Sequence, residues 1–211
     1  MQIETFVFNP IQVNTYILYD HTKECIVIDA GNYTADEDHL IQSFISDNNL
    51  IVKNVLCTHG HFDHILGCSF FETTYNIGAE VMPMDETFIR NVAEYANFFG
   101  IKGVKVPQKL GFLRDQQIIK AGDYELAVSH TPGHSSGGCV FVNYCDKILF
   151  SGDTLFRGSI GRTDLPDGNY KVLLQSISQK LFTLDRNFQV FPGHGTSTTI
   201  AKEVDSNPFF R

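Results

Sequence analysis

Several features are missing from this 211-residue chain, and each absence excludes a class of protein. No stretch approaches the ~18 uninterrupted apolar residues of a membrane-spanning helix. The amino terminus, MQIETFVFNPIQVNTYIL, has an early acidic residue and no basic segment, so it reads as an alternating strand rather than a secretory signal peptide. There is no low-complexity segment, internal repeat or flexible linker. We therefore expect one soluble, cytoplasmic domain spanning residues 1–211, with no membrane partner.

Positive charge is also scarce. The chain has 16 Lys plus Arg against 24 Asp plus Glu, a net charge of −8, and its basic residues are scattered. Because nucleic-acid binding depends on neutralising phosphates, we expect no nucleic-acid partner, and a nuclease is disfavoured for the same reason. The partner that we expect is a small-molecule substrate.

Cysteine pairs are missing too. The five cysteines are an odd number and form no CxxC motif, so we interpret them as buried, inert thiols. Two of them, Cys57 and Cys68, flank a cluster of histidines and could line a site.

Short runs of β-branched and aromatic residues are abundant, and most of them end in Gly, Asp or Pro, which is typical of strands. The predicted strands are Ile11–Tyr19, Glu24–Asp29, Val52–Thr58, Ala79–Met82, Tyr124–His130, Gly138–Tyr144, Lys147–Ser151 and Phe188–Phe191. Helical spacing of apolar residues predicts helices that start at Thr34 and that span about Asp63–Thr74, Glu86–Phe99 and Asn169–Leu184. Thr34 and Glu37 form a capping box at the first of these helices. Strands and helices in this order predict an α/β layered domain.

The segment THGHFDH, Thr58 to His64, carries three histidines and an aspartate directly after a predicted strand. Imidazole and carboxylate groups are suitable ligands for zinc, iron and related metals. Crowded titratable groups would also be costly in a partly buried pocket without a cation. Taken alone, the segment is equally compatible with an accidental surface site.

Three later motifs strengthen the metal interpretation, because each places a His or Asp where a predicted strand ends. HTPGHSSGG contains His134, ILFSGDTLF contains Asp153, and QVFPGHGTSTT contains His194. Glycines beside them let backbone segments approach closely. His130 lies in the first of these motifs and is interpreted as structural, whereas His21 and His39 lie outside every motif and are expected at the surface.

These motifs, in this order, resemble those of the metallo-β-lactamase-fold hydrolases, and most closely the small glyoxalase II-like (hydroxyacylglutathione hydrolase-like) members. The resemblance runs from IDAG at Ile28–Gly31 to PGHGTSTTIAKEVDSNPFF, so it covers nearly the whole chain. It implies a four-layer αβ/βα sandwich of two mixed β-sheets flanked by helices. Glyoxalase II enzymes carry a further C-terminal helical domain with glutathione-binding groups, and the sequence ends before such a domain.

The resemblance also implies the roles of individual residues. His59, His61 and His134 would hold one divalent metal ion, and Asp63, His64 and His194 a second. Asp153 would bridge the two ions, and Asp29 would orient a ligand histidine through a hydrogen bond. The expected metal is Zn²⁺, with Fe or Mn as alternatives.

The expected reaction is hydrolysis of a hydroxyacyl-thiol ester such as S-lactoylglutathione by a metal-bridging hydroxide, with Asp63 and Asp153 as catalytic residues. A metal-bound water can have a pKa near ~7, so hydroxide is available at neutral pH. In FRGSIGRTDL, Arg157 and Arg162 are candidates for substrate binding, although Arg162 could instead pair with Asp164 and brace the loop.

Other readings remain open. A mononuclear-iron persulfide dioxygenase would share the fold and the His-x-His-x-Asp-His run, and a lactonase or an inert metal-binding protein are further alternatives. A β-lactamase is disfavoured, because the main zinc β-lactamases carry a cysteine where Asp153 stands.

Overall fold

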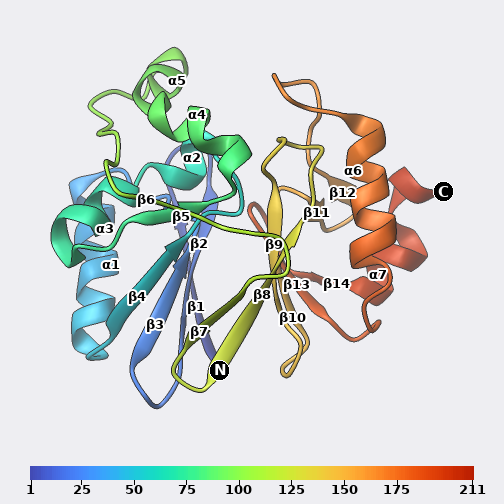
Figure 1. Cartoon of the computed structure of the whole chain (residues 1–211), viewed down its shortest axis with the longest axis horizontal. Coiled ribbons are helices and arrows are strands. Elements are labelled where there is room, and N and C mark those ends of the chain that lie inside the picture. The colour runs from blue at the N-terminus through green and yellow to red at the C-terminus, as the bar shows by residue number, and fades with distance from the viewer.

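The structure, a computed structural model, describes residues 1–211 and contains two six-stranded sheets that pack against each other (Figure 1). The first sheet has the order β1-β2-β3-β4-β5-β6, with β1–β3 antiparallel and β3–β6 parallel. Its strands are β1 Gln2–Phe8, β2 Val13–Tyr19, β3 Glu24–Ile28, β4 Ile51–Leu56, β5 Ala79–Val81 and β6 Leu110–Phe112.

The second sheet has the order β14-β13-β10-β9-β8-β7 and is also mixed, because β10 and β13 run parallel whereas the other pairs are antiparallel. Its strands are β7 Ile118–Ala121, β8 Tyr124–His130, β9 Cys139–Asn143, β10 Ile148–Gly152, β13 Gln189–Pro192 and β14 Thr198–Thr199. A separate small hairpin joins β11 (Leu155–Phe156) to β12 (Ser159–Ile160).

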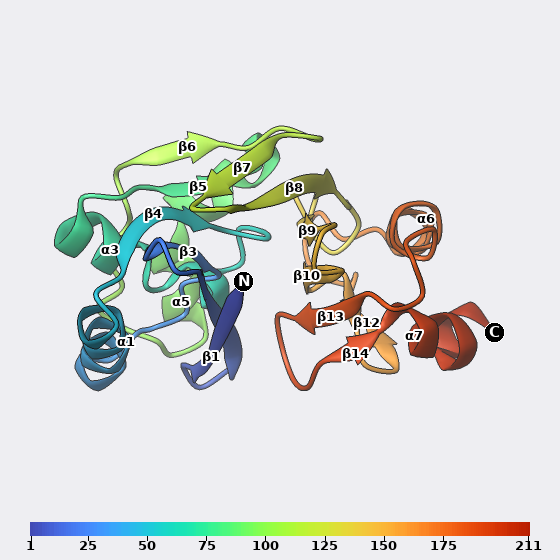
Figure 2. The same cartoon turned by 90° about the horizontal axis from the view of Figure 1, so that it is seen from below.

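Helices cover the outer faces of both sheets, as Figure 2 shows from below. On the first sheet lie α1 Ala35–Asp47, α2 Phe62–Ile65, α3 Cys68–Tyr75, η1 Pro83–Asp85, α4 Glu86–Arg90 and α5 Val92–Phe98. On the second lie α6 Tyr170–Ser176 with a π-helical turn η2 Ile177–Leu181, α7 Ile200–Ser206 and η3 Pro208–Phe210. No helix is long and apolar enough to cross a membrane.

Three apolar clusters bind the four layers together. Alternate residues of β2 point to opposite faces, so Ile17 packs toward the first helical layer and Leu18 packs between the sheets. Phe141 and Phe150 of the second sheet complete the cluster between the sheets, and the third cluster joins that sheet to α6 and α7. The predicted sandwich of two mixed sheets flanked by helices is therefore confirmed.

Most predicted strands are found within two residues of their predicted bounds, and the strand Tyr124–His130 is found as predicted. The capping box is also confirmed, because the Thr34 hydroxyl accepts from the Glu37 N–H and the Glu37 carboxylate accepts from the Thr34 N–H. This arrangement satisfies two of the free N–H groups at the start of α1.

Two predicted helices are wrong as continuous elements. The segment Asp63–Thr74 divides into α2 and α3 at Gly67, whose N–H donates to the Ala30 carbonyl and whose Cα lies against the Asn32 side chain. The segment Glu86–Phe99 divides into α4 and α5 at Asn91, whose side-chain amide donates to the Thr87 carbonyl at 2.8 Å. A side chain that competes for a helix carbonyl in this way favours a break.

Candidate metal centre

Four strand ends, drawn from both sheets, meet at one place. The turn that carries His59 to His64 follows β4, and the other three candidates follow β8, β10 and β13. Backbone hydrogen bonds join the sheets there, from the Cys139 N–H to the Thr58 carbonyl (2.8 Å) and from the Asn14 N–H to the Gly193 carbonyl (2.7 Å). His64 and His194, which are 130 positions apart in the chain, therefore become neighbours.

The first group of candidate ligands consists of His59, His61 and His134, whose ring nitrogens all lie within 4.8 Å of one another. His61 Nδ1 and His134 Nε2 are only 2.8 Å apart. His59 is 2% exposed, and its buried Nε2 has no hydrogen-bond partner. Three imidazole nitrogens thus converge on one point.

The second group consists of Asp63, His64 and His194. Asp63 Oδ2 lies 3.2 Å from His194 Nε2 and 3.6 Å from His64 Nε2, and the two histidine nitrogens are 3.2 Å apart. This group combines a carboxylate with two imidazoles, whereas the first has imidazoles alone.

Asp153 lies between the two groups. Its Oδ2 is 3.5 Å from His134 Nε2 of the first group, and its Oδ1 is 3.4 Å from His64 Nε2 of the second. Oδ1 is buried and has no hydrogen-bond partner. One carboxylate therefore presents an oxygen to each group.

The charge distribution differs between the two groups. Burial and the neighbouring histidines lower the pKa of His61 to about 4, and burial also holds the pKa of His59 well below its usual value. Burial alone would lower the pKa of His64 as well, but the carboxylates of Asp63 and Asp29 raise it above the usual value. His59 and His61 thus present unprotonated nitrogens, whereas carboxylates surround His64.

The second ring nitrogen of each of four histidines is also engaged. His64 Nδ1 lies 2.9 Å from Asp29 Oδ2, which is the contact that the sequence predicted for Asp29. The remaining contacts are His59 Nδ1 with Thr58 Oγ1 (3.1 Å), His134 Nδ1 with the Arg162 carbonyl (2.8 Å) and His194 Nδ1 with the Gln12 carbonyl (3.1 Å). Metal-ligating histidines typically make such contacts, which fix the ring orientation.

The residues present fit a cation. Leaving a buried polar atom unpaired costs about 1–3 kcal/mol, and both His59 Nε2 and Asp153 Oδ1 are in that state. Both atoms lie in a group of imidazole nitrogens and carboxylate oxygens within 4.8 Å of one another, so a positive ion would satisfy them together. Imidazole and carboxylate are donors that borderline divalent metals accept.

Comparison with known proteins decides the family. The chain matches the Metallo-beta-lactamase superfamily over residues 8–194. It is 34% identical over 214 residues to the hydroxyacylglutathione hydrolase GloC of Haemophilus influenzae, covering 99% of this chain and 98% of that protein. This chain belongs to the metallo-β-lactamase superfamily.

Two solved structures of this superfamily are similar along the whole chain. The BLEG-1 B3 metallo-beta-lactamase is 32% identical with a TM-score of 0.88, covering 99% of each chain. TTHA1623 in a di-iron-bound form is 31% identical with a TM-score of 0.86, covering 99% of this chain and all of the other. The superfamily and its named relatives make this chain a metal-dependent hydrolase.

The two arginines that are candidates for substrate binding, Arg157 and Arg162, have different surroundings. Arg162 Nε and Nη2 each lie 2.7 Å from a carboxylate oxygen of Asp164, in an exposed bidentate pair. Arg157 is exposed, and its side chain has one long contact, 3.4 Å from Nη1 to Thr196 Oγ1, two residues after His194. Of these two arginines, Arg157 is the one without a carboxylate partner.

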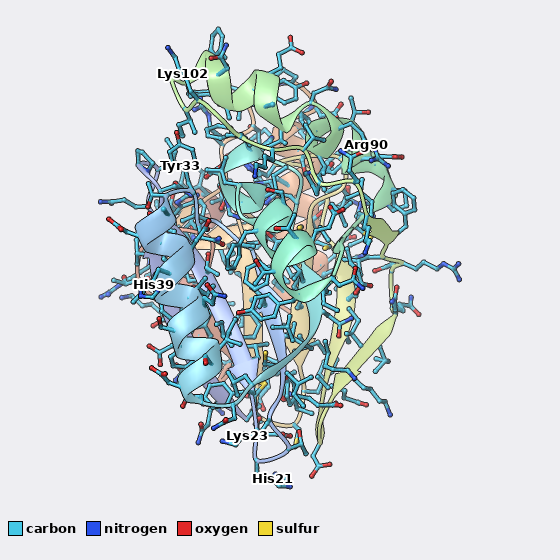
Figure 3. All side chains as sticks on the ribbon, turned by 90° about the vertical axis from the view of Figure 1, so that its left-hand side faces the viewer. His21, Lys23, Tyr33, His39, Arg90 and Lys102 are labelled. Carbon is cyan, nitrogen blue, oxygen red and sulfur yellow. The ribbon has the colours of Figure 1, made fainter.

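The remaining candidates lie away from the ligand atoms. Cys57 and Cys68 are buried with their sulfurs 3.8 Å apart, and neither belongs to a group of ligand atoms. His130 Nε2 lies 2.9 Å from the Ser136 carbonyl oxygen. His21 and His39 are exposed, as predicted; in Figure 3, His39 lies on α1 and His21 lies at the bottom, in the turn between β2 and β3.

Several residues that contact the site were not predicted from the sequence. Thr58, Gln12 and Asp85 contact the ligand histidines or their neighbours, and the Phe88 ring lies 5.2 Å from the His61 ring. Gln12 has a positive φ of 61°, which is uncommon outside glycine. This conformation is visible only in the structure. Asp85 and Phe88 lie in a helical segment with no motif, so the sequence offered no signal for them.

Proposed function

We propose that this chain is a glyoxalase II-like thioesterase that hydrolyses a hydroxyacyl-thiol ester such as S-lactoylglutathione. The observation that carries the proposal is the position of Asp153, with one oxygen toward each of two three-residue ligand groups. Such an arrangement suits two ions and a substrate between them, unlike the closed four-ligand set of a structural zinc site. The relative named hydroxyacylglutathione hydrolase supports the thioester substrate.

In this proposal, His59, His61 and His134 would hold one divalent ion, Asp63, His64 and His194 would hold the other, and Asp153 would contribute to both sites. Zn²⁺ is the proposed metal. Fe and Mn remain alternatives, and the di-iron form of TTHA1623 favours testing iron beside zinc. When bound, the two ions would activate water for attack and stabilise the oxyanion that forms on the substrate carbonyl.

The side chains themselves supply ionisation and position. Burial would raise the pKa of Asp63, but His64 and His194 lower it, so the carboxylate stays ionised and can accept a hydrogen bond from the attacking water. Asp29 holds the ring of His64 through Nδ1, which keeps Nε2 directed at the site. A thiolate leaving group, with a solution pKa of about 8.5, needs little help from a general acid.

The rim of the site favours a substrate with an anionic arm. Arg157 offers an exposed guanidinium without a carboxylate partner, beside the loop that carries His194. Glutathione thioesters carry carboxylates, with which a guanidinium forms paired hydrogen bonds. We propose Arg157 as the residue that binds this arm, and Arg162 as the brace of its own loop.

Arg157→Ala should raise KM for S-lactoylglutathione about tenfold with little change in kcat, because a lost hydrogen bond to a charged group costs about 1.5–3 kcal/mol. Arg162→Ala is the matched comparison, because its side chain already pairs with Asp164, and its KM should change less than twofold. Steady-state kinetics on both variants check this. A KM change below twofold for Arg157→Ala would remove it from the substrate site.

The function itself is tested by hydrolysis of S-lactoylglutathione with purified, metal-loaded protein, using His59→Ala as the blank. Turnover that is lost in the blank supports the proposal. No turnover, with metal still bound, would exclude glutathione as the thiol.

Two rival activities are measured in the same preparation. The similarity to BLEG-1 favours β-lactam hydrolysis as the second candidate. Loss of β-lactam absorbance would reveal it. Oxygen consumption with a persulfide, in the iron-loaded protein, would instead identify a dioxygenase.

A further inference from the structure

A buried carboxylate lies beside the first ligand group without belonging to it. Asp85, the last residue of η1, is 0% exposed. Its Oδ2 accepts hydrogen bonds from the Gly60 N–H and from the Ser135 hydroxyl, both at 2.8 Å. Its Oδ1 accepts a third from the Gly137 N–H at 2.6 Å. An isolated buried carboxylate is costly, so these three donors account for its presence.

The three donors come from the two loops that carry the first ligand group. Gly60 lies between His59 and His61, whereas Ser135 and Gly137 come one and three residues after His134. Asp85 is the one side chain outside these loops that hydrogen-bonds to both of them. It therefore links the His59–His61 turn of the first sheet to the His134 loop of the second.

Both loops are shaped closely around this carboxylate. A Cβ at Gly60 would lie 2.8 Å from the Asp85 carbonyl oxygen, and a Cβ at Gly137 would lie 2.5 Å from the Asp85 Cγ and Oδ1. No side chain fits at either position without displacing Asp85. The loops and the carboxylate thus form one packed unit.

Asp29 makes the corresponding arrangement at the second ligand group. It is 1% exposed and accepts from the Thr58 N–H and hydroxyl, both at 2.7 Å, and lies 2.9 Å from His64 Nδ1. The turn Thr58–His64 is therefore held by two buried carboxylates, one on each side. Asp29 contacts a ligand ring directly, whereas Asp85 acts on the backbone that carries the ligands.

We propose that Asp85 is a positioning residue that sets the spacing of His59, His61 and His134, and so controls the affinity of the first metal ion without affecting the second. The inference rests on the proposed metal centre. Asp85 belongs to neither group of candidate ligand atoms, so we expect its substitution to change metal affinity first and catalysis only through the metal. Changes in residues that orient metal ligands typically reduce metal affinity about 10–100-fold.

The test measures binding of Zn²⁺ to the metal-free full chain in competition with a chromophoric chelator. Asp85→Asn replaces one oxygen by an NH₂ group, which must then face the Gly60 or the Gly137 N–H. In a His194→Ala background, which impairs the second group, Asp85→Asn should lower the remaining affinity at least tenfold. In a His61→Ala background, which impairs the first group, it should change affinity less than twofold.

Glu203→Gln is the matched control for a general loss of stability. Glu203 is also 0% exposed and accepts from the Gly158 N–H, the Thr198 hydroxyl and the Asn207 amide, but it holds a different loop. It should lower the Tm without lowering Zn²⁺ affinity. Equal loss of affinity in both variants, or a change below twofold for Asp85→Asn at the first group, would overturn the proposal.

If Asp85→Asn does not fold, Ser135→Ala tests the same role of Asp85. This variant removes only one of the three hydrogen-bond donors to the carboxylate. It should lower first-ion affinity about three- to fivefold, and an unchanged affinity would overturn the proposal. The readout is independent of turnover. A protein that binds two ions but cleaves no thioester would refute the proposed substrate and leave the role of Asp85 intact.

Discussion

Asp153→Ala should reduce kcat/KM for S-lactoylglutathione at least 1000-fold, the largest loss that we expect from a single substitution. The Asp153 carboxylate is the one group that faces both ligand groups, and its removal leaves His134 and His64 without a shared anion. A loss of this size corresponds to about 4 kcal/mol of transition-state stabilisation. Steady-state kinetics with matched metal loading measure it.

Asp146→Ala is the control for this change. Asp146 lies in the turn before β10, at the opposite end of the same strand, and its only ion pair is with the amino terminus at 3.5 Å. Its kcat/KM should stay within twofold of the wild type. A residual rate above one tenth in Asp153→Ala at full metal occupancy would contradict the bridging role.

Removal of the metal ions should lower the Tm by about 8–16 °C for each site. A ligand at about 1000 times its Kd stabilises the folded state by about 4.1 kcal/mol, and a chain of this size shifts by about 2–4 °C per kcal/mol. The physical reason is that His59 Nε2 and Asp153 Oδ1 are buried without partners until an ion binds. Thermal unfolding before and after chelation, followed by addition of Zn²⁺, measures the shift.

His59→Ala separates the two sites in this experiment. It removes one ligand of the first group and leaves the second group complete, so chelation should lower its Tm by about half as much as in the wild type. If chelation leaves the wild-type Tm unchanged and no metal is released, the chain binds no ion in the site.

The sequence predicted the fold correctly where buried apolar residues recur with the regular spacing of a strand or a helix. Strands such as Tyr124–His130 are apolar on alternate or on both faces, and the capping residues of α1 are only three positions apart in the chain. The errors occur where a distant contact overrides the local pattern. The break between α2 and α3 depends on a contact of Gly67 with Asn32, which lies 35 positions earlier in the chain. The spacing of apolar residues in Asp63–Thr74 does not indicate this contact.

The sequence by itself determined the layered fold and the chemical identity of the candidate ligands, because the residues of each motif are close together in the chain. Only the tertiary structure decided which atoms meet. It directs His61 Nδ1, rather than Nε2, toward His134, gives each oxygen of Asp153 its own ligand group, and buries Asp85 against two loops. Such pairings depend on how two separate sheets pack together, and no local run of residues encodes that distance.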